Sequence, residues 1–89
     1  MLAGYNVTTG SENTLLGGLA GDALTTGGSN IVVGVGSLSA DTQGSRSVAV
    51  GRSALQDQNF TTATDAYNIA IGYKAGSAVT TGTFNTIVG

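Results

Sequence analysis

Few residues of this chain have side chains suited to catalysis. It contains no histidine and no cysteine, and it has only three lysine and arginine residues against five aspartate and glutamate residues. General acid–base catalysis would have to draw on scattered carboxylates, one lysine or tyrosines, without a recognisable pair of nucleophile and base. We therefore expect no enzymatic activity, no cofactor and no metal site, and the lack of cysteine excludes disulfides and thiolate ligands.

The polar side chains that could bind a ligand gather in one segment, "QDQNFTTATDAYN", residues 56 to 68. Aligned backwards from Asn68, Thr64-Asp65 occupies the place of a Thr-Gly pair, and four surplus residues are expected to bulge between Gln56 and Ala63. Insertions on repeat scaffolds often lie on binding faces. The alternatives are a tolerated surface bulge and an aromatic ring that fills a gap in the core. The candidate ligand-binding residues are Asp57, Gln58, Asn59, Phe60, Thr61, Thr62 and Tyr67.

Threonines before glycine form a second set of regularly spaced polar groups. They occur at residues 8 to 10, 25 to 27 and 80 to 82, with Gln43 replacing one threonine at residues 42 to 44. A flat threonine array would suggest ice binding, which we keep as an alternative function. Adjacent residues of a strand point to opposite faces, so each pair offers one threonine to a given face.

These residues must be positioned by a repeat, because one short frame recurs along the whole chain. It reads "NTLLG", "NIVVG", "SVAVG", "NIAIG" and "NTIVG". The first residues of the five frames are Asn13, Asn30, Ser47, Asn68 and Asn85, at intervals of 17, 17, 21 and 17 residues. Such self-similarity is typical of a repeat protein. The chain divides into one domain of five units, 1-17, 18-34, 35-51, 52-72 and 73-89.

A unit of this length predicts one turn of a parallel β-solenoid. It is too short for a helix with two linkers, and the Asn-Gly pairs typical of tight hairpins never occur. Each apolar run is rich in β-branched residues and ends at glycine, as a short strand before a turn would. The fold class is therefore all-β, a parallel β-roll or solenoid of five coils of about 17 residues, with equivalent residues stacked at strand spacing.

Both faces of each predicted strand are apolar, so one of them requires a cover outside the coil. We assign the columns at positions 14 and 16 of the repeat to the interior and the column at position 15 to the outside. Only 9% of residues are charged, which also favours a self-associating protein. Covering loops of the same chain are the alternative. The predicted oligomer interface is Leu15, Val32, Ala49, Ala70 and Ile87.

The remaining features limit the partners of the chain. The recurrent asparagines can form a stacked amide ladder or simply open each strand after a turn. With a net charge of −2, the chain has no basic footprint for nucleic acid. No apolar run is long enough for a membrane span, so direct membrane insertion is not expected.

Two segments resemble a known family. "SRSVAVGRSA" and "NIAIGYKAG" resemble the head repeats of trimeric autotransporter adhesins, the YadA-like heads. The wider frame, Ala-Gly followed by Thr-Thr-Gly and the asparagine run, is similar to repeats of phage tail fibres and other fibrous surface proteins. The units here are longer, and those at Thr14 and Thr86 lack the central alanine. The resemblance implies a left-handed β-roll in which three chains pack side by side.

The function implied is that of a structural or adhesive module in an elongated trimeric surface fibre, either a bacterial adhesin head or a phage tail fibre. Such a module would lie outside the cell or on a virion, pack against copies of itself and contact a host-surface protein or glycan. A spacer without a ligand is the alternative within the same class. Since both end units lack a polar cap, we expect a fragment of a longer fibre.

Overall fold

The computed structural model describes residues 3 to 89, which form an all-β chain without any helix. Its main strands are short, because a glycine turns the chain directly after each apolar run of three residues. The strands are β1 (Thr14–Leu16), β2 (Ile31–Val33), β3 (Gly44–Ser45), β4 (Val48–Val50), β5 (Thr64–Asp65), β6 (Ile69–Ile71) and β7 (Thr86–Val88).

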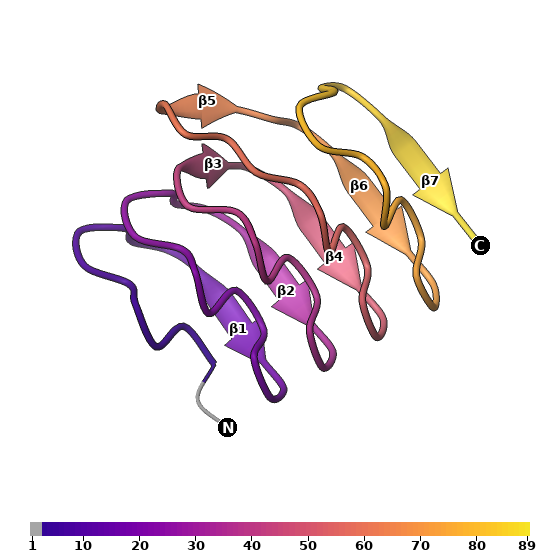
Figure 1. Ribbon diagram of the computed structural model, residues 1–89, viewed down its shortest axis with the longest axis horizontal. Helices are drawn as coiled ribbons and strands as arrows, with labels where there is room; N and C mark the ends of the chain where they lie inside the picture. The colour runs from indigo at the N-terminus through magenta and orange to yellow at the C-terminus, as the bar shows by residue number, and fades with distance from the viewer. Residues whose placement is uncertain (1–2) are drawn as a thin grey trace.

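The strands stack in parallel as the 17-residue period predicts (Figure 1). Five of them form one sheet in the order β1-β2-β4-β6-β7, and β3 pairs with β5 in a separate two-stranded sheet. The register joins equivalent positions of successive units, so that Leu15 lies beside Val32 and Ala49 beside Ala70. The chain thus winds as a β-solenoid of about four turns, which confirms the predicted parallel solenoid.

The corners of the solenoid depend on left-handed backbone. The glycine after each strand of the five-stranded sheet has φ between 112° and 132°, a region that residues with a side chain rarely adopt. At the other end of these strands, a non-glycine residue with φ between 53° and 62° precedes the polar residue that opens the strand. These pre-strand corner residues are Glu12, Ser29, Arg46, Tyr67 and Phe84.

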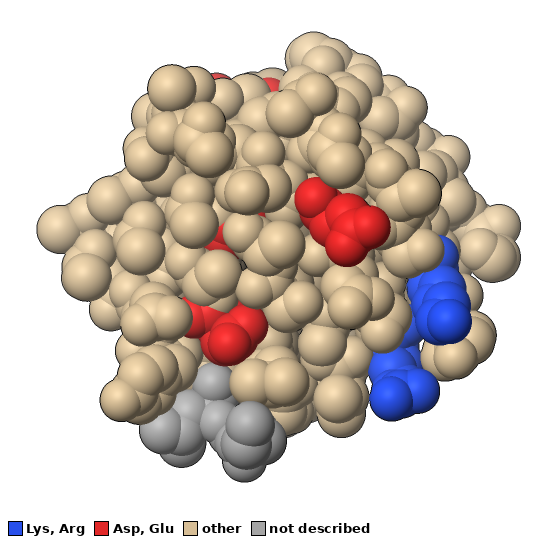
Figure 2. Space-filling model, in the orientation of Figure 1, with Lys and Arg blue, Asp and Glu red and all other residues tan. Residues whose placement is uncertain are grey.

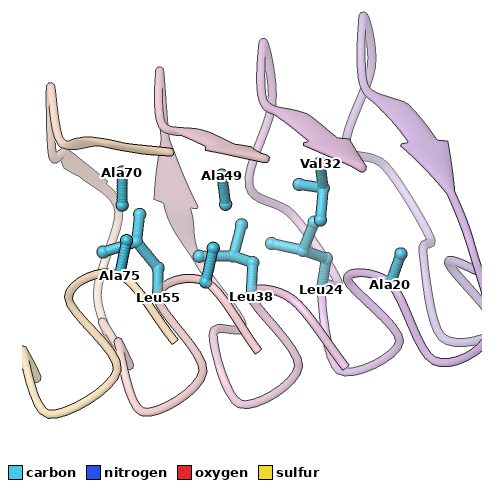
Figure 3. Close-up of a cluster of buried hydrophobic side chains, with 9 residues drawn as sticks. Ala20, Leu24, Val32, Leu38, Ala49, Leu55, Ala70 and Ala75 are labelled. Atoms are coloured by element: carbon cyan, nitrogen blue, oxygen red, sulfur yellow. The ribbon is translucent and has the colours of Figure 1, made fainter. Parts of the chain in front are cut away.

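The interior is narrow and is filled from two walls that complement each other in size. Figure 3 shows leucines of one wall facing small or β-branched residues of the strands. Where the strand contributes a larger side chain, such as Leu15, the opposite wall has glycine, and a Cβ at Gly21 would lie 2.9 Å from a Leu15 methyl. The fully buried side chains at the centre of the core are Leu24, Val32, Leu38, Ala49, Leu55 and Ala70.

The predicted assignment of the two strand faces is wrong. Val32, Ala49 and Ala70 are fully buried, and Leu15 and Ile87 pack against the same core. The column proposed as the oligomer interface therefore lines the interior, and the columns at positions 14 and 16 face outward. The physical reason is space, because leucines from the opposite wall occupy the interior and leave room only for small or β-branched side chains in the central units.

Strain at a corner gives a first testable expectation. Ser53 has φ of 61°, whereas the equivalent residue of the preceding unit, Gly36, has φ of 70°. Left-handed backbone destabilises the folded state by about 1 to 2 kcal/mol at a non-glycine residue. Glycine removes this strain, but its greater entropy in the unfolded chain cancels about 0.5 to 1 kcal/mol of the gain in stability. We expect Ser53→Gly to raise the melting temperature by a few degrees in thermal unfolding. An unchanged or lower melting temperature would contradict the strain at this corner.

Candidate interaction surface

An apolar strip runs across the outward face of the five-stranded sheet. It is built by the first and third residues of each strand, because alternate side chains of a strand share one face. Ile31 and Ile71 are 45% and 43% exposed, and the strip contains no charged residue. We call this surface the outer strip, and its residues are Thr14, Leu16, Ile31, Val33, Val48, Val50, Ile69, Ile71, Thr86 and Val88.

Charged and aromatic side chains lie along the two long edges of the outer strip. Before the strands lie the pre-strand corner residues, among which the Tyr67 and Phe84 rings stack with centroids 5.0 Å apart at 19°. After the strands lie Arg52, Tyr73 and Lys74, all exposed, with the Lys74 ammonium 5.4 Å from the Tyr73 ring centroid. In Figure 2, charged side chains are sparse on the visible face, and its basic groups gather at one edge. The strip is thus an uncharged surface bordered on both edges by charged and aromatic side chains.

The predicted ligand-binding residues do not form one exposed loop. Gln58 is fully buried and Phe60 nearly so, whereas Asp57, Asn59, Thr61 and Thr62 are exposed. Tyr67 is 43% exposed, but it stacks on Phe84 at the edge of the outer strip. The prediction that Phe60 fills the core is therefore the better of the two alternatives for this residue. Of the predicted residues on the insertion, only Asp57, Asn59, Thr61 and Thr62 are therefore exposed together.

The insertion also has a different register from the predicted one. Thr64 pairs with Gly44, and Asp65 pairs with Ser45, so Thr64 rather than Asp65 occupies the glycine position. One surplus residue is then Ala66, which is fully buried and lies between β5 and the pre-strand corner residue Tyr67. The remaining surplus lies among residues 60 to 63. The expected bulge is consequently split, and only part of it extends from the surface.

A buried polar cluster holds the insertion to the preceding unit. The Gln58 Nε2 donates to Asp41 Oδ2 at 2.8 Å and to Ser47 Oγ at 2.9 Å. The Gln58 Oε1 accepts from Asn68 Nδ2 at 2.8 Å. The other carboxylate oxygen of Asp41 accepts from the backbone N–H groups of Phe60, at 2.8 Å, and Gly44, at 3.2 Å. All of these side chains are fully buried, and none of their polar atoms lacks a partner.

The environment of Asp41 affects the pH dependence of stability. Burial raises the pKa of its carboxyl group, and the hydrogen bonds from Phe60, Gln58, Gly44 and Thr42 offset part of this effect. Because the folded chain then binds this proton more tightly than the unfolded chain, the free energy of unfolding falls as the pH rises from the ordinary value of 3.8 through the raised pKa. The contribution of Asp41 to stability is complete only below that window.

Sequence reasoning missed this cluster, although two signals were present. The equivalent positions in the other units are apolar, namely Val7, Leu24 and Val79, so consecutive polar residues at 41 and 58 are exceptional. In addition, Ser47 replaces the recurrent asparagine in the same unit. The shorter serine side chain leaves the space through which Gln58 reaches Asn68.

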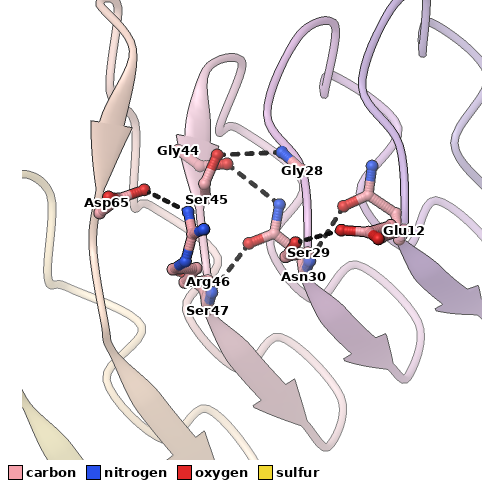
Figure 4. A network of polar contacts seen from close by, with 10 residues as sticks. Glu12, Gly28, Ser29, Asn30, Gly44, Ser45, Arg46, Ser47 and Asp65 are labelled. Carbon is pink, nitrogen blue, oxygen red and sulfur yellow. Dashed lines mark hydrogen bonds and ion pairs between the residues drawn. The ribbon is translucent and has the colours of Figure 1, made fainter.

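The recurrent asparagines clamp successive units through the backbone. Asn30 Nδ2 donates to the Gly44 carbonyl at 3.0 Å, and Asn30 Oδ1 accepts from the Ser47 N–H at 2.9 Å (Figure 4). Asn13 and Asn68 make the same pair of bonds to the units that follow them. These three amides therefore do not bond to one another as a stacked ladder, and each opens its strand while joining its unit to the next.

The threonine column has a structural use as well. The hydroxyl groups of Thr8, Thr25 and Thr42 donate to backbone carbonyls of the following unit at 3.0 to 3.2 Å. The outer threonines, Thr9, Thr26 and Thr81, are exposed, but Gln43 and the insertion interrupt their row. No observation favours a continuous threonine array for ice binding.

Metal-ligand clusters and membrane-spanning helices are both absent from residues 3 to 89. This part of the chain holds no group of three metal-ligating acidic, histidine or cysteine side chains. Nor does it contain a helix with the length and hydropathy of a membrane span. Comparison of the chain with protein-family models, with curated proteins and with solved structures gave no match.

Proposed function

We propose that the chain is a structural and adhesive module of an elongated trimeric surface fibre, in which left-handed solenoids of five coils pack side by side. The observation that carries this proposal is the outer strip, an uncharged apolar surface that continues across all five strands of the sheet. Monomeric soluble proteins rarely expose a continuous apolar surface of this kind unless it binds a partner.

A second copy of the same chain is the occupant that fits the strip best. Its side chains repeat along the stack at the strand spacing of about 4.7 to 4.9 Å. A partner can match this spacing over the whole strip only if its own surface has the same repeat, which a second solenoid provides. The net charge of −2 is also too small to oppose association of copies by repulsion.

The adhesive part of the proposal is supported by the resemblance to adhesin heads and tail fibres. Continuous ladders of parallel strands make a stiff rod, and association of several rods multiplies any weak contact with a host surface. The exposed residues of the insertion, Asp57, Asn59, Thr61 and Thr62, are the candidates for contact with a host-surface protein or glycan. The fibre would belong to a bacterial surface or to a virion.

The self-association is tested by placing charges on the outer strip. Full burial of an isoleucine side chain contributes about 1.5 to 3 kcal/mol, and a lysine in its place also has to be desolvated. We expect Ile31→Lys/Ile71→Lys to sediment as a monomer at concentrations where the wild-type chain is a trimer. The measurement is sedimentation equilibrium between about 1 and 100 µM, where micromolar dissociation constants are resolved.

A matched control carries two lysines on another face. Thr26→Lys/Thr81→Lys makes the same change in net charge at exposed positions away from the strip, and it should associate like the wild-type chain. Circular dichroism of both variants checks that the fold is retained. A wild-type chain that remains monomeric throughout the concentration range would refute the proposed function.

A further inference from the structure

Three exposed residues gather at the corner of the solenoid where β4 and β6 end. Arg52 follows the glycine after β4, and Tyr73 and Lys74 follow the glycine after β6. Arg52 and Tyr73 occupy equivalent positions of successive units, so their backbones lie side by side at the strand spacing of about 4.7 to 4.9 Å. The Lys74 ammonium lies 5.4 Å from the Tyr73 ring centroid. We call these three residues the post-strand cluster.

The backbone of the post-strand cluster is held in place by the solenoid. The Lys74 N–H donates to the Arg52 carbonyl at 2.9 Å, and the Lys74 carbonyl accepts from the Ser77 N–H at 3.1 Å. The two cations therefore belong to neighbouring coils that are joined directly at this corner. Binding a ligand to residues on such a fixed backbone requires no ordering of a loop, which lowers the entropic cost of the contact.

The two cations of the cluster are available to an anion. Within residues 3 to 89 the only ion pair joins Arg46 and Asp65, at 2.7 Å. Arg52 and Lys74 therefore have no carboxylate partner in this part of the chain, and both are exposed. Tyr73 is 61% exposed, so most of its surface stays accessible beside Lys74. The cluster thus offers two positive charges and one aromatic ring at a single corner.

We infer that the post-strand cluster binds an acidic sugar, a saccharide that carries a carboxylate or sulfate group. Arg52 and Lys74 bind the acidic group, because a guanidinium and an ammonium form charge-assisted hydrogen bonds with its oxygens. Tyr73 binds the apolar face of the sugar, since tyrosine supplies a large, rigid contact at a low entropic cost. The inference deepens the adhesive part of the proposed function, on which it rests for its biological role. It names the ligand class and a site separate from the insertion.

The charges of the chain favour this ligand over other anions. A nucleic acid or another long polyanion would meet a net charge of −2 and only two cations outside the ion pair. An inorganic anion would bind the cations and leave the ring without a contact, and a neutral sugar would leave both cations without one. An acidic sugar engages all three side chains. Because each copy carries one cluster, association of copies multiplies a weak affinity for a glycan-covered surface.

The test titrates the chain with three saccharides that share one scaffold, namely lactose, sialyllactose and sulfated lactose. Inorganic sulfate is the fourth ligand, and binding is followed by NMR through the amide signals of residues 51 to 54 and 72 to 75. We expect saturable shifts at millimolar concentration with at least one acidic saccharide, and binding at least about tenfold weaker for lactose and for sulfate. The saccharide that binds shows whether the carboxylate or the sulfate is recognised.

Substitution of the cations tests the charged contact. Arg52→Gln/Lys74→Gln should weaken binding of the acidic saccharide about tenfold and remove most of its dependence on salt concentration. Thr9→Glu/Thr26→Glu makes the same change in net charge at exposed and half-exposed positions of another wall, and it should have a smaller effect. Circular dichroism checks that both variants keep the fold. Equal weakening by the two variants would mean that net charge, and not the cluster, governs binding, which would overturn the inference.

Substitution of the ring tests the apolar contact. Tyr73→Leu keeps an apolar side chain and should weaken binding about threefold. Tyr5→Leu makes the same change at a tyrosine of the first unit that is 70% exposed, and it should leave binding unchanged.

The outcomes separate this inference from the proposed function, because the cluster lies within one chain and binds its ligand whether or not copies associate. A chain that associates but gives no saturable shift with either acidic saccharide, or that binds sulfate as tightly as the saccharides, would overturn the inference alone. A chain that binds an acidic saccharide but stays monomeric would refute the proposed fibre and support the saccharide site.

Discussion

Gly51→Ala is expected to lower the melting temperature by more than about 12 °C or to prevent folding, an effect of about 3 kcal/mol or more. Gly51 has φ of 129°, and a Cβ at this position would lie 2.5 Å from the Gly72 carbonyl oxygen. The obstacle is backbone that belongs to the sheet ladder, so it cannot move aside as a flexible side chain would. The collision also recurs in the stack, because Gly34 meets the Gly51 carbonyl in the same way.

The control separates steric collision from backbone strain. Gly36 also has a left-handed backbone, with φ of 70°, but the nearest atom to an added Cβ is Ser53 Oγ at 3.8 Å. Gly36→Ala should therefore cost only the left-handed penalty of about 1 to 2 kcal/mol. Thermal unfolding followed by circular dichroism measures both variants. If the two alanines lowered the melting temperature equally, the close stacking of the strand-ending glycines would be disproved.

The period made the stacking of the chain predictable. Apolar runs at intervals of 17 residues with one of 21, each ended by glycine and without proline, leave parallel stacking as the arrangement in which every run pairs with its neighbours. The runs at Thr14–Leu16, Ile31–Val33, Val48–Val50, Ile69–Ile71 and Thr86–Val88 are the strands of the five-stranded sheet. The short β3 and β5 carry no comparable apolar signal, and they were not predicted.

The direction of the faces could not be derived from hydrophobicity, because both faces are apolar. Alternation shows only that Ala49 lies opposite Val48 and Val50. Which side is interior depends on the wall across the coil, where Leu38 and Leu55 fill the space next to Ala49 and Ala70. The small size of the two alanines was the available sign. To recognise the alanines as inward-facing, one must first know that the leucines lie across the coil from them. The alternation of residues within a strand does not reveal such a long-range contact.

The insertion was predicted, but its register and the buried polar cluster were not, because the two form one feature. In the first two units, the N–H groups of Gly10 and Gly27 donate to a threonine carbonyl of the following unit. In the third unit, the shifted path of the insertion gives Gly44 no such carbonyl, and Asp41 accepts its hydrogen bond instead. A buried carboxylate is tolerated here because its acceptor capacity replaces backbone acceptors that the insertion has displaced.

Gln58→Glu is expected to convert this cluster into a pH-sensitive site. The amide nitrogen that now lies 2.8 Å from Asp41 Oδ2 becomes an oxygen, so two carboxyl groups share one buried contact. They can remain together only while one proton lies between them, and this raises the pKa of the pair. In acid, the protonated group can donate to Asp41 and still accept from Asn68, so the variant should approach wild-type stability. The free energy of unfolding should then fall by about 1.4 kcal/mol per pH unit above the unfolded-state pKa.

Gln56→Glu is the matched control, since Gln56 is exposed two residues away and undergoes the same chemical change. Urea unfolding between about pH 4 and pH 8 should show a loss of more than about 2 kcal/mol for the buried substitution across this range, after subtraction of the control. Gln58→Leu removes the amide at similar volume and should be destabilised at every pH, because the buried Ser47 and Asn68 side chains lose their hydrogen bonds to Gln58 whether or not Asp41 is protonated. A Gln58→Glu variant whose stability follows that of Gln56→Glu would mean that Gln58 does not contact Asp41 in the buried cluster.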